Sequence, residues 1–308
     1  MDKLKSYIKI ARPDHWIKQL FILPGIWLAA VLTDTQPGIF RILVCLLATS
    51  FAASANYVIN EWLDAEFDRF HPTKKNRPCV SEELKSGYVY TEYIILVILS
   101  VLTSLYLNCP VTYFILFLLV MGIVYNVKPL RTKDIPYLDV ITESINNAIR
   151  FAIGWFCVTG DYYPPLSFIT GYWLAGAFLM AAKRFAEYRM INNPAQAALY
   201  RKSFGGYTEV TLLLSAVFYA LMSVFFCGVF LIKYKIELLL AIPFICGLFI
   251  CYLQLCYKHD SAAQKPEKLF HEKGLMLYLL LLALLFVALY YSNIPLLNAF
   301  LRTDLVRI

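Results

Sequence analysis

Long apolar runs recur along almost the whole chain, and they restrict its fold more than any other feature of the sequence. A helical run of about 20 residues is long enough to span the hydrocarbon core of a bilayer. The 60% share of hydrophobic residues is far above what a soluble domain needs, and most charged residues lie between the runs. We predict nine spans, at 17–34, 40–61, 88–108, 110–126, 136–159, 166–188, 207–233, 236–257 and 274–292.

The predicted spans must be helices. Hydrocarbon contains no water to satisfy unpaired backbone groups, so only helices and closed barrels cross a membrane. Segments such as 277–289 lack the alternating pattern of a barrel strand. We therefore predict an all-α, polytopic membrane protein with nine transmembrane helices and a single transmembrane domain over residues 1–308.

Lys and Arg are distributed unevenly between the two sides of the membrane. With the N-terminus in the cytoplasm, 22 of the 28 basic residues fall on the cytoplasmic side, 5 fall outside, and Arg150 lies inside a span. The positive-inside rule therefore predicts a multi-pass protein of the cell membrane with a cytoplasmic N-terminus and an external C-terminus. The net charge of +7 fits loops that face anionic lipid and phosphates, so no nucleic acid partner is expected.

The eight cysteines show no CxxC pairing, and most of them fall inside apolar spans. A cysteine in such a span acts as a small hydrophobic residue. We therefore expect neither a thiolate metal centre nor a disulfide framework. The long, charged loops follow the second, fourth, sixth and eighth spans, so we expect the chemistry on the cytoplasmic side.

The second span ends in a stripe of polar residues. Asn60, Asp64 and Asp68 recur every four residues, which places them on one face of a helix at the membrane boundary. Carboxylate and amide oxygens suit Mg²⁺, which takes its remaining ligands from water and substrate phosphates. We predict that Asn60, Asp64 and Asp68 form a catalytic magnesium site. The alternative is a solvated helix end without a metal.

Basic side chains adjoin this stripe, as a phosphorylated ligand requires. We assign Arg69, Lys74 and Arg77 in the next loop to substrate phosphates, although an ordinary positive-inside loop would look the same. For Lys128 and Lys133, after the fourth span, a surface position fits as well as a phosphate contact. Further substrate-binding residues are predicted outside the loop at 69–77 and outside the fifth span: Lys18, Lys128, Lys183, Arg184, Glu187, Arg201 and Lys202.

The fifth predicted span carries polar residues at helical spacing. Its shared face is formed by Asp139, Glu143, Asn146, Asn147 and Arg150. Ionisable groups inside a membrane are costly, so this face should line the bundle interior or a polar cavity. We assign Glu143 and Arg150 to substrate binding. The alternative is that they pair with neighbouring residues and tie helices together.

The stretch NEWLDAEFDR, residues 60–69, resembles the NDxxDxxxDR signature of the UbiA prenyltransferase superfamily, with Glu61 in place of an Asp. Within that superfamily, the chain is most similar to the branch that transfers phosphoribosyl groups to polyprenyl phosphates. The stretches that carry this likeness are 12–18, 68–78, 182–187 and 201–208. The resemblance covers about residues 11–215, and beyond them only the hydrophobic pattern agrees.

The resemblance implies a helix bundle with a cytoplasm-facing cavity. It also implies a magnesium-dependent transfer of 5-phosphoribosyl from phosphoribosyl pyrophosphate to a polyprenyl phosphate in the membrane, with release of pyrophosphate. Superfamily members that use an isoprenyl diphosphate typically carry a second aspartate-rich motif after the sixth span, where this chain has Lys183, Arg184 and Glu187. Lys and Arg bind phosphate directly, which favours the phosphoribosyl branch.

Two other functions stay open at the level of sequence. A prenyltransferase would move an isoprenyl group onto an aromatic or quinone acceptor, with Glu187 and Glu209 in place of the second motif. A transporter should carry polar residues in both halves of the membrane, whereas here they crowd toward the cytoplasmic side. The sequence leaves the oligomeric state open, a homo-oligomer included.

Overall fold

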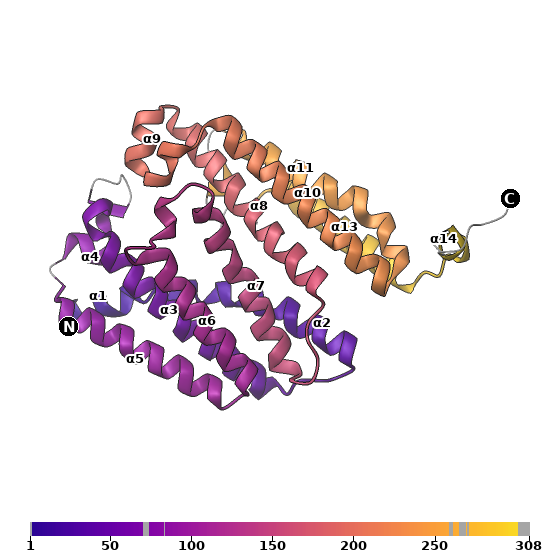
Figure 1. Cartoon of the computed structure of the whole chain (residues 1–308), viewed down its shortest axis with the longest axis horizontal. Helices are drawn as coiled ribbons and strands as arrows, with labels where there is room; N and C mark the ends of the chain where they lie inside the picture. Colours follow the sequence, from indigo (N-terminus) through magenta and orange to yellow (C-terminus); the bar gives the residue numbers. More distant parts are fainter. Residues whose placement is uncertain are drawn as a thin grey trace. The chain divides into compact units, whose positions relative to one another are not determined.

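The computed structural model describes residues 2–69, 74–82, 84–258, 261–264, 269 and 271–300. All regular elements in these ranges are helices, which confirms the predicted fold class (Figure 1). The chain divides into two compact units, Met1–Pro164 and Pro165–Ile308. The prediction of a single transmembrane domain stays a prediction.

Eight segments of the described chain are long and apolar enough to cross a membrane. They are Lys5–Thr33, Ile39–Glu66, Ser86–Leu105, Cys109–Asn126, Leu166–Ile191, Glu209–Tyr234, Ile236–Cys256 and Lys273–Tyr291. The fifth predicted span is helix α7, Leu138–Val158, which has 21 residues and carries several charges. Each predicted span thus corresponds to a helical segment, while the count of nine crossings and the orientation of the termini stay predictions.

The first unit begins with three helices, α1 (Asp2–Ile10), the 3-10 helix η1 (Pro13–Ile22) and α2 (Leu23–Thr33). The predicted span 17–34 therefore combines two helix types. Pro13 and Pro24 both lie in the first turn of a helix, where the missing N–H of proline leaves no hydrogen bond unmade. Arg12, between α1 and η1, has a left-handed backbone conformation.

The remaining helices of the first unit are α3 (Ile39–Asp68), η2 (Lys74–Asn76), α4 (Pro78–Ser81), α5 (Ser86–Leu105), α6 (Cys109–Asn126), η3 (Thr132–Asp134) and α7 (Leu138–Val158). α3 continues to Asp68, beyond the predicted end at 61, so the whole carboxylate stripe is helical. α3 packs against α5, α6 and η1, and α7 packs against α2, α6 and η1. Polar residues of η1, α3, α6 and α7 are thereby brought into one region.

Two glycines allow α7 to lie directly against the N-terminal helices. A Cβ atom at Gly25 would be 2.0 Å from the carbonyl oxygen of Phe151, and one at Gly154 would be 2.0 Å from the carbonyl oxygen of Ile22. A side chain at either position would collide with the backbone of the opposite helix, so only glycine fits. This backbone contact fixes η1 and α2 against α7.

Small residues line the helix contacts of the first unit, while large apolar ones face outward. Ala48, Ala52 and Ala55 of α3 are fully buried. Close backbone approach through small residues is typical of helices that pack in membranes. Leu102 of α5 and Leu284 of α13 in the second unit are more than half exposed, as expected for side chains in contact with lipid.

The second unit consists of α8 (Leu166–Ile191), α9 (Pro194–Tyr200), η4 (Lys202–Gly206), α10 (Glu209–Tyr234), η5 (Ile236–Ala241), α11 (Ile242–Cys256), η6 (Ala262–Gln264), α13 (Lys273–Tyr291) and α14 (Pro295–Phe300). α8 packs along α10, and α11 packs against α13. α10 begins with a capping box in which Thr208 and Thr211 satisfy each other's backbone N–H groups.

Candidate active site

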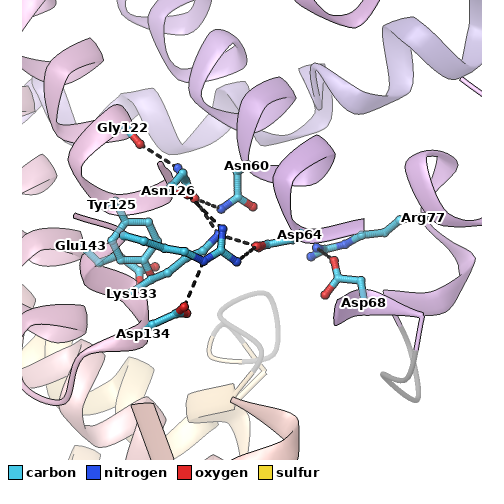
Figure 2. A network of polar contacts seen from close by, with 11 residues as sticks. Asn60, Asp64, Asp68, Arg77, Gly122, Tyr125, Asn126, Lys133, Asp134 and Glu143 are labelled. Atoms are coloured by element: carbon cyan, nitrogen blue, oxygen red, sulfur yellow. Dashed lines mark hydrogen bonds and ion pairs between the residues drawn. The ribbon is translucent and has the colours of Figure 1, made fainter. Parts of the chain in front are cut away.

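The carboxylate stripe of α3 meets the connection between α6 and α7 (Figure 2). Asp64 Oδ1 accepts hydrogen bonds from Arg131 Nη2 at 2.8 Å and from Lys133 Nζ at 2.5 Å. The Asp64 side chain is only 17% exposed and the two cations are 8% exposed. Burial lowers the pKa of the Lys133 amine, and the Asp64 carboxylate counteracts this shift. Because buried charges need partners, these ion pairs hold the connection onto α3.

The connection turns its cations inward because its backbone is held in a defined conformation. Arg131 has a φ of 31°, in the left-handed region that residues with a side chain rarely adopt. Its guanidinium donates to the Asn126 carbonyl oxygen at 3.0 Å and to Asp134 Oδ2 at 3.1 Å. The Thr132 and Thr142 hydroxyls share a hydrogen bond of 2.9 Å. These contacts offset the backbone strain at Arg131.

Asn60 lies one helical turn from Asp64 and joins the same network. Its Nδ2 donates to Asn126 Oδ1, which also accepts from Lys133 Nζ at 2.9 Å. Asn126 Nδ2 donates to the Gly122 carbonyl oxygen at 2.9 Å, which fixes the orientation of the Asn126 amide. Asn60 Oδ1 and Asp64 Oδ2 accept no hydrogen bond from the residues that the structure describes, and both oxygens are available to a ligand.

This donor set fits one magnesium ion. An amide oxygen of Asn60 and a carboxylate oxygen of Asp64 are hard ligands on the same helix face, with Asp68 one turn further. Mg²⁺ in proteins usually binds one or two carboxylates together with phosphates and water. In the described ranges, no three His, Cys, Asp or Glu side chains gather into a metal-binding group. The remaining ligands would therefore come from substrate and water.

Asp68, the third member of the stripe, is engaged by the segment that follows it. Its Oδ2 accepts a hydrogen bond from Arg77 Nη1 at 2.5 Å, and the Asp68 side chain is 6% exposed. Figure 2 shows Asp68 turned toward Arg77. Arg77, which the sequence assigns to substrate phosphate, thus pairs with the end of α3 in this structure. Arg69 is exposed, and the side chain of Lys74 lies outside the described residues.

The cations that pair with Asp64 are Arg131 and Lys133. Lys128, which we predicted to bind substrate, is not one of them. Lys128 is exposed, whereas Arg131 and Lys133 are buried on the carboxylate. From the sequence alone, Lys133 fits a surface position as well as a phosphate contact, and Arg131 is not among the predicted site residues. Periodicity carries no information here, because both residues lie at a 3-10 turn between two helices. The available signal was the density of charge in residues 131–134.

Glu61, where the superfamily signature has Asp, ties the N-terminal segment to α3. Its Oε2 accepts hydrogen bonds from Arg12 Nη2 at 2.6 Å and Arg12 Nε at 3.2 Å. The same guanidinium lies 5.6 Å from the ring centroid of Tyr57. The Glu61 carboxylate is thus engaged through Oε2 by the N-terminal segment. Nearby on η1, Lys18 Nζ lies 3.4 Å from His15 Nδ1.

The polar face of α7 contacts two neighbouring helices. Glu143 Oε2 accepts a hydrogen bond from the Tyr125 hydroxyl of α6 at 2.9 Å. Arg150 Nε donates to Gln19 Oε1 of η1 at 2.9 Å, and Arg150 Nη1 donates to the Asn146 carbonyl oxygen at 3.2 Å. These contacts agree with the helix-tying interpretation. The roles of Glu143 and Arg150 in substrate binding stay predictions.

In the second unit, basic residues gather around Glu187 near the end of α8. Arg184 Nη1 lies 3.5 Å and Arg201 Nε lies 4.0 Å from Glu187 Oε2. The Arg184 side chain is 2% exposed, Lys183 is half-buried, and Lys202 is exposed. Positive charge therefore outweighs negative charge in this cluster.

Both carboxylates considered as substitutes for a second metal-binding motif are paired with arginines. Glu187 is contacted by Arg184 and Arg201. Glu209 forms an ion pair with Arg189, whose guanidinium also lies over the Tyr257 ring. Guanidinium groups recognise phosphate oxygens by direct hydrogen bonds. The described part of the second unit thus contains arginines paired with these carboxylates and no group of three metal-binding side chains.

Comparison with known proteins finds similarity to phosphoribosyltransferases and to prenyltransferases. The chain is 27% identical over 212 residues to decaprenyl-phosphate phosphoribosyltransferase of Corynebacterium glutamicum, and 29% identical over 216 residues to the protein of the same name from Mycolicibacterium smegmatis. Each alignment covers 67% of this chain, and they span 60% and 64% of the two relatives. The 4-hydroxybenzoate octaprenyltransferase of Paraburkholderia phymatum is 30% identical over 88 residues, 27% of this chain and 30% of the relative.

Solved structures share the fold. A UbiA homologue from Archaeoglobus fulgidus, bound to DMAPP and Mg²⁺, matches with a TM-score of 0.68 at 19% identity and covers 93% of this chain and 100% of that chain. A digeranylgeranylglyceryl phosphate synthase matches with a TM-score of 0.65 at 18% identity, covering 94% and 98%. The model of the UbiA prenyltransferase family matches residues 21–273. Because that match runs from the end of η1 to the start of α13, the chain belongs to the UbiA prenyltransferase family.

Proposed function

We propose that this UbiA family member transfers 5-phosphoribosyl from phosphoribosyl pyrophosphate to a polyprenyl phosphate in the membrane and releases pyrophosphate. The observation that carries the proposal is the cation cluster around Glu187, at the position where users of isoprenyl diphosphates need metal-binding carboxylates. The names of the relatives at 27% and 29% identity support the same reaction.

The α3 site suits the pyrophosphate of the donor. Asn60 and Asp64 would hold Mg²⁺, with Asp68 as a further oxygen donor, and the ion would neutralise charge on the leaving group. Arg131 and Lys133 stand directly beside Asp64, so we assign them to the donor's pyrophosphate oxygens. A low-dielectric, buried position makes such fixed charges more effective than they are in water.

Arg69, Lys74 and Arg77 keep their proposed assignment to donor phosphates, in the segment that follows the stripe. Lys183, Arg184 and Arg201 are assigned to a phosphate group of the donor or the acceptor. The water-soluble donor and the lipid acceptor must meet at one membrane boundary. We therefore propose the predicted orientation, with this boundary on the cytoplasmic side.

The reaction needs little acid–base help from the protein. A phosphate monoester is anionic at neutral pH, because its second pKa is about 6. The barrier therefore lies in breaking the bond between ribose C1 and the pyrophosphate oxygen. The protein's contribution is to hold both phosphates so that an acceptor oxygen faces C1, and to neutralise the charge that develops on the leaving group.

Transfer of an isoprenyl group to an aromatic acceptor is the second candidate, favoured by the match to a 4-hydroxybenzoate octaprenyltransferase. That reaction requires an apolar surface for the isoprenyl chain. The face of α7 near the Asp64 site instead carries Glu143, Asn146 and Arg150, which would be costly to cover with hydrocarbon. The transporter interpretation is not proposed, because the family is one of transferases.

The proposal is tested by giving the purified protein two substrate pairs side by side. One pair is radiolabelled phosphoribosyl pyrophosphate with polyprenyl phosphates of several chain lengths, and the other is an isoprenyl diphosphate with 4-hydroxybenzoate. We expect a labelled lipid from the first pair only, and no product after chelation of Mg²⁺. Prenylated hydroxybenzoate without a labelled lipid would replace the proposal with the second candidate.

A further inference from the structure

Two amide side chains beside Arg150 carry buried polar atoms that have no hydrogen-bond partner among the described residues. These atoms are Gln19 Nε2 and Asn146 Oδ1. The whole Gln19 side chain is fully buried. Both residues contact Arg150, Gln19 through its Oε1 and Asn146 through its carbonyl oxygen. An unpaired buried polar group is costly, so both atoms point to a bound group that completes their hydrogen bonds.

Arg150 determines which polar atom of the Gln19 amide has no hydrogen-bond partner among the described residues. A guanidinium has only donors, so Gln19 must turn its oxygen toward Arg150 and leaves Nε2 as an unused donor. Asn146 Oδ1 contributes the complementary feature, an unused acceptor. A hydroxyl group can accept from the first and donate to the second. A ligand hydroxyl can therefore satisfy either atom, whereas an anion cannot donate to Asn146 Oδ1 and an apolar group can satisfy neither.

The position of Asn146 and Arg150 along α7 bears on which part of the donor Gln19 and Asn146 could contact. Glu143 contacts α6 beside the Asp64 network. On α7, Asn146 and Arg150 follow Glu143 by about 4.5 Å and about 10 Å along the helix axis, at 1.5 Å per residue. Both residues thus lie on α7 about one to two turns beyond the contact of Glu143 with α6, and this is where we place the sugar of a donor whose pyrophosphate lies at Asp64.

A third buried amide, that of Asn56, has an unpaired oxygen that close helix packing explains. Asn56 Oδ1 also lacks a partner among the described residues. A Cβ atom at Gly122 would be 1.9 Å from this oxygen, so the Asn56 side chain lies against the backbone of α6. Its Nδ2 donates to the Leu118 carbonyl oxygen at 3.0 Å. Asn56 is thus a helix contact and supplies a structural control.

We infer that Gln19 and Asn146 bind a hydroxyl group of the donor's ribose, with Arg150 holding Gln19 in position. The inference rests on the proposed function and adds two specificity-determining residues to it. An isoprenyl chain has no hydroxyl and would leave both amides unpaired. A site built to hydrogen-bond a hydroxyl discriminates strongly against a ligand that lacks one.

The test compares phosphoribosyl pyrophosphate with its 2-deoxy and 3-deoxy analogues in the wild type and in Gln19→Glu. A glutamate keeps an acceptor for Arg150 and removes the amide donor. We expect the wild type to prefer the ribose donor over at least one deoxy analogue by about tenfold or more in kcat/KM. Gln19→Glu should lower kcat/KM for the ribose donor by roughly five- to a hundredfold and change that for the analogue little.

Asn56→Ala is the matched control. It should lower the unfolding temperature and leave the preference for the ribose donor unchanged. If Gln19→Glu slows the ribose donor and both analogues by the same factor, the amides hold a water molecule or a structural contact, and the inference is wrong while the proposed function stands. If phosphoribosyl pyrophosphate neither reacts with the wild type nor raises its unfolding temperature, the proposed function fails, and the inference with it.

Discussion

Asp64 in the first unit and Glu187 in the second are carboxylates near the ends of long helices, and each is contacted by two basic side chains. At Asp64 the cations approach to 2.5 Å and 2.8 Å, and both use the same oxygen. At Glu187 the two arginine nitrogens lie at 3.5 Å and 4.0 Å.

The neighbours of the two carboxylates differ more than the carboxylates themselves. Asp64 is followed and preceded at helical spacing by oxygen donors, Asp68 and Asn60, which suit a metal. Glu187 lies among Lys183, Arg184 and Arg201, which suit a phosphate. We therefore propose that a carboxylate with two basic partners serves metal binding in the first unit and lies within an anion-binding cluster in the second, according to its other neighbours.

Replacing the proposed metal ligand should produce the largest effect. Asp64→Asn keeps a hydrogen-bond acceptor for Arg131 and Lys133 but removes the charge that a magnesium ion requires. We expect turnover to fall by roughly a hundredfold or more in a protein that is still folded in detergent, with a lower unfolding temperature because the buried Arg131 and Lys133 lose their counter-charge. Activity and the Mg²⁺ dependence of thermal unfolding are the measurements. Asp134→Asn removes the other carboxylate of Arg131 and should cost much less, and full activity in Asp64→Asn would end the metal assignment.

A smaller effect is expected from the cation beside that ligand. Lys133→Ala should raise the KM for phosphoribosyl pyrophosphate by roughly ten- to a hundredfold, because a hydrogen bond to a charged group contributes about 1.5–3 kcal/mol. Steady-state kinetics at saturating Mg²⁺ measures this. The exposed Lys85 is the control, since Lys85→Ala should change nothing. An unchanged KM in Lys133→Ala would make the ion pair with Asp64 purely structural.

Much of this site followed from helical spacing. Asn60, Asp64 and Asp68 could be placed on one face because residues four apart on a helix are neighbours. Arg131 and Lys133 could not be placed, because their direction depends on a left-handed residue and on contacts across two helices. Gln19 escaped notice because a single amide in an apolar run has no periodic partners. Its relation to Arg150 appears only when η1 packs on α7.

The glycines of the two units offer a further comparison. Gly154→Ala should destabilise the protein by about 1–3 kcal/mol, since its Cβ would lie 2.0 Å from a backbone oxygen of η1. At Gly171 in α8 the nearest atoms would be 3.4 Å away, which is ordinary packing. Gly171→Ala should therefore be neutral or slightly stabilising. Thermal unfolding of the two variants in the same detergent measures the difference, and equal losses would contradict the tight contact in the first unit.

The smallest signal is expected from cysteine labelling, which tests the orientation of the protein in the membrane. The orientation decides whether the end of α3 that carries Asp64 faces the cytoplasm. Cys109 at the start of α6 is exposed, while burial, aided by Glu61, raises the pKa of Cys79 in α4 to about 12. The reactive thiolate is therefore scarce at Cys79 at pH 8. In intact cells, a membrane-impermeant maleimide should label a variant with Cys109 as its sole cysteine, whereas a variant with Cys79 alone should stay unlabelled in either orientation and gives the background. Labelling of the Cys109 variant only after the membrane is made permeable would invert the predicted topology.

The most direct test of the central claim, that the second unit binds phosphate through cations rather than through a second metal, is the substrate choice of variants at Lys183 and Arg184. Lys183→Ala and Arg184→Ala should each lower kcat/KM for phosphoribosyl transfer by roughly ten- to a hundredfold, and added Mg²⁺ should not restore it. Lys183→Asp should lose phosphoribosyl transfer and gain nothing with isoprenyl diphosphates. Prenyl transfer gained in Lys183→Asp, with full activity in both Ala variants, would contradict the account.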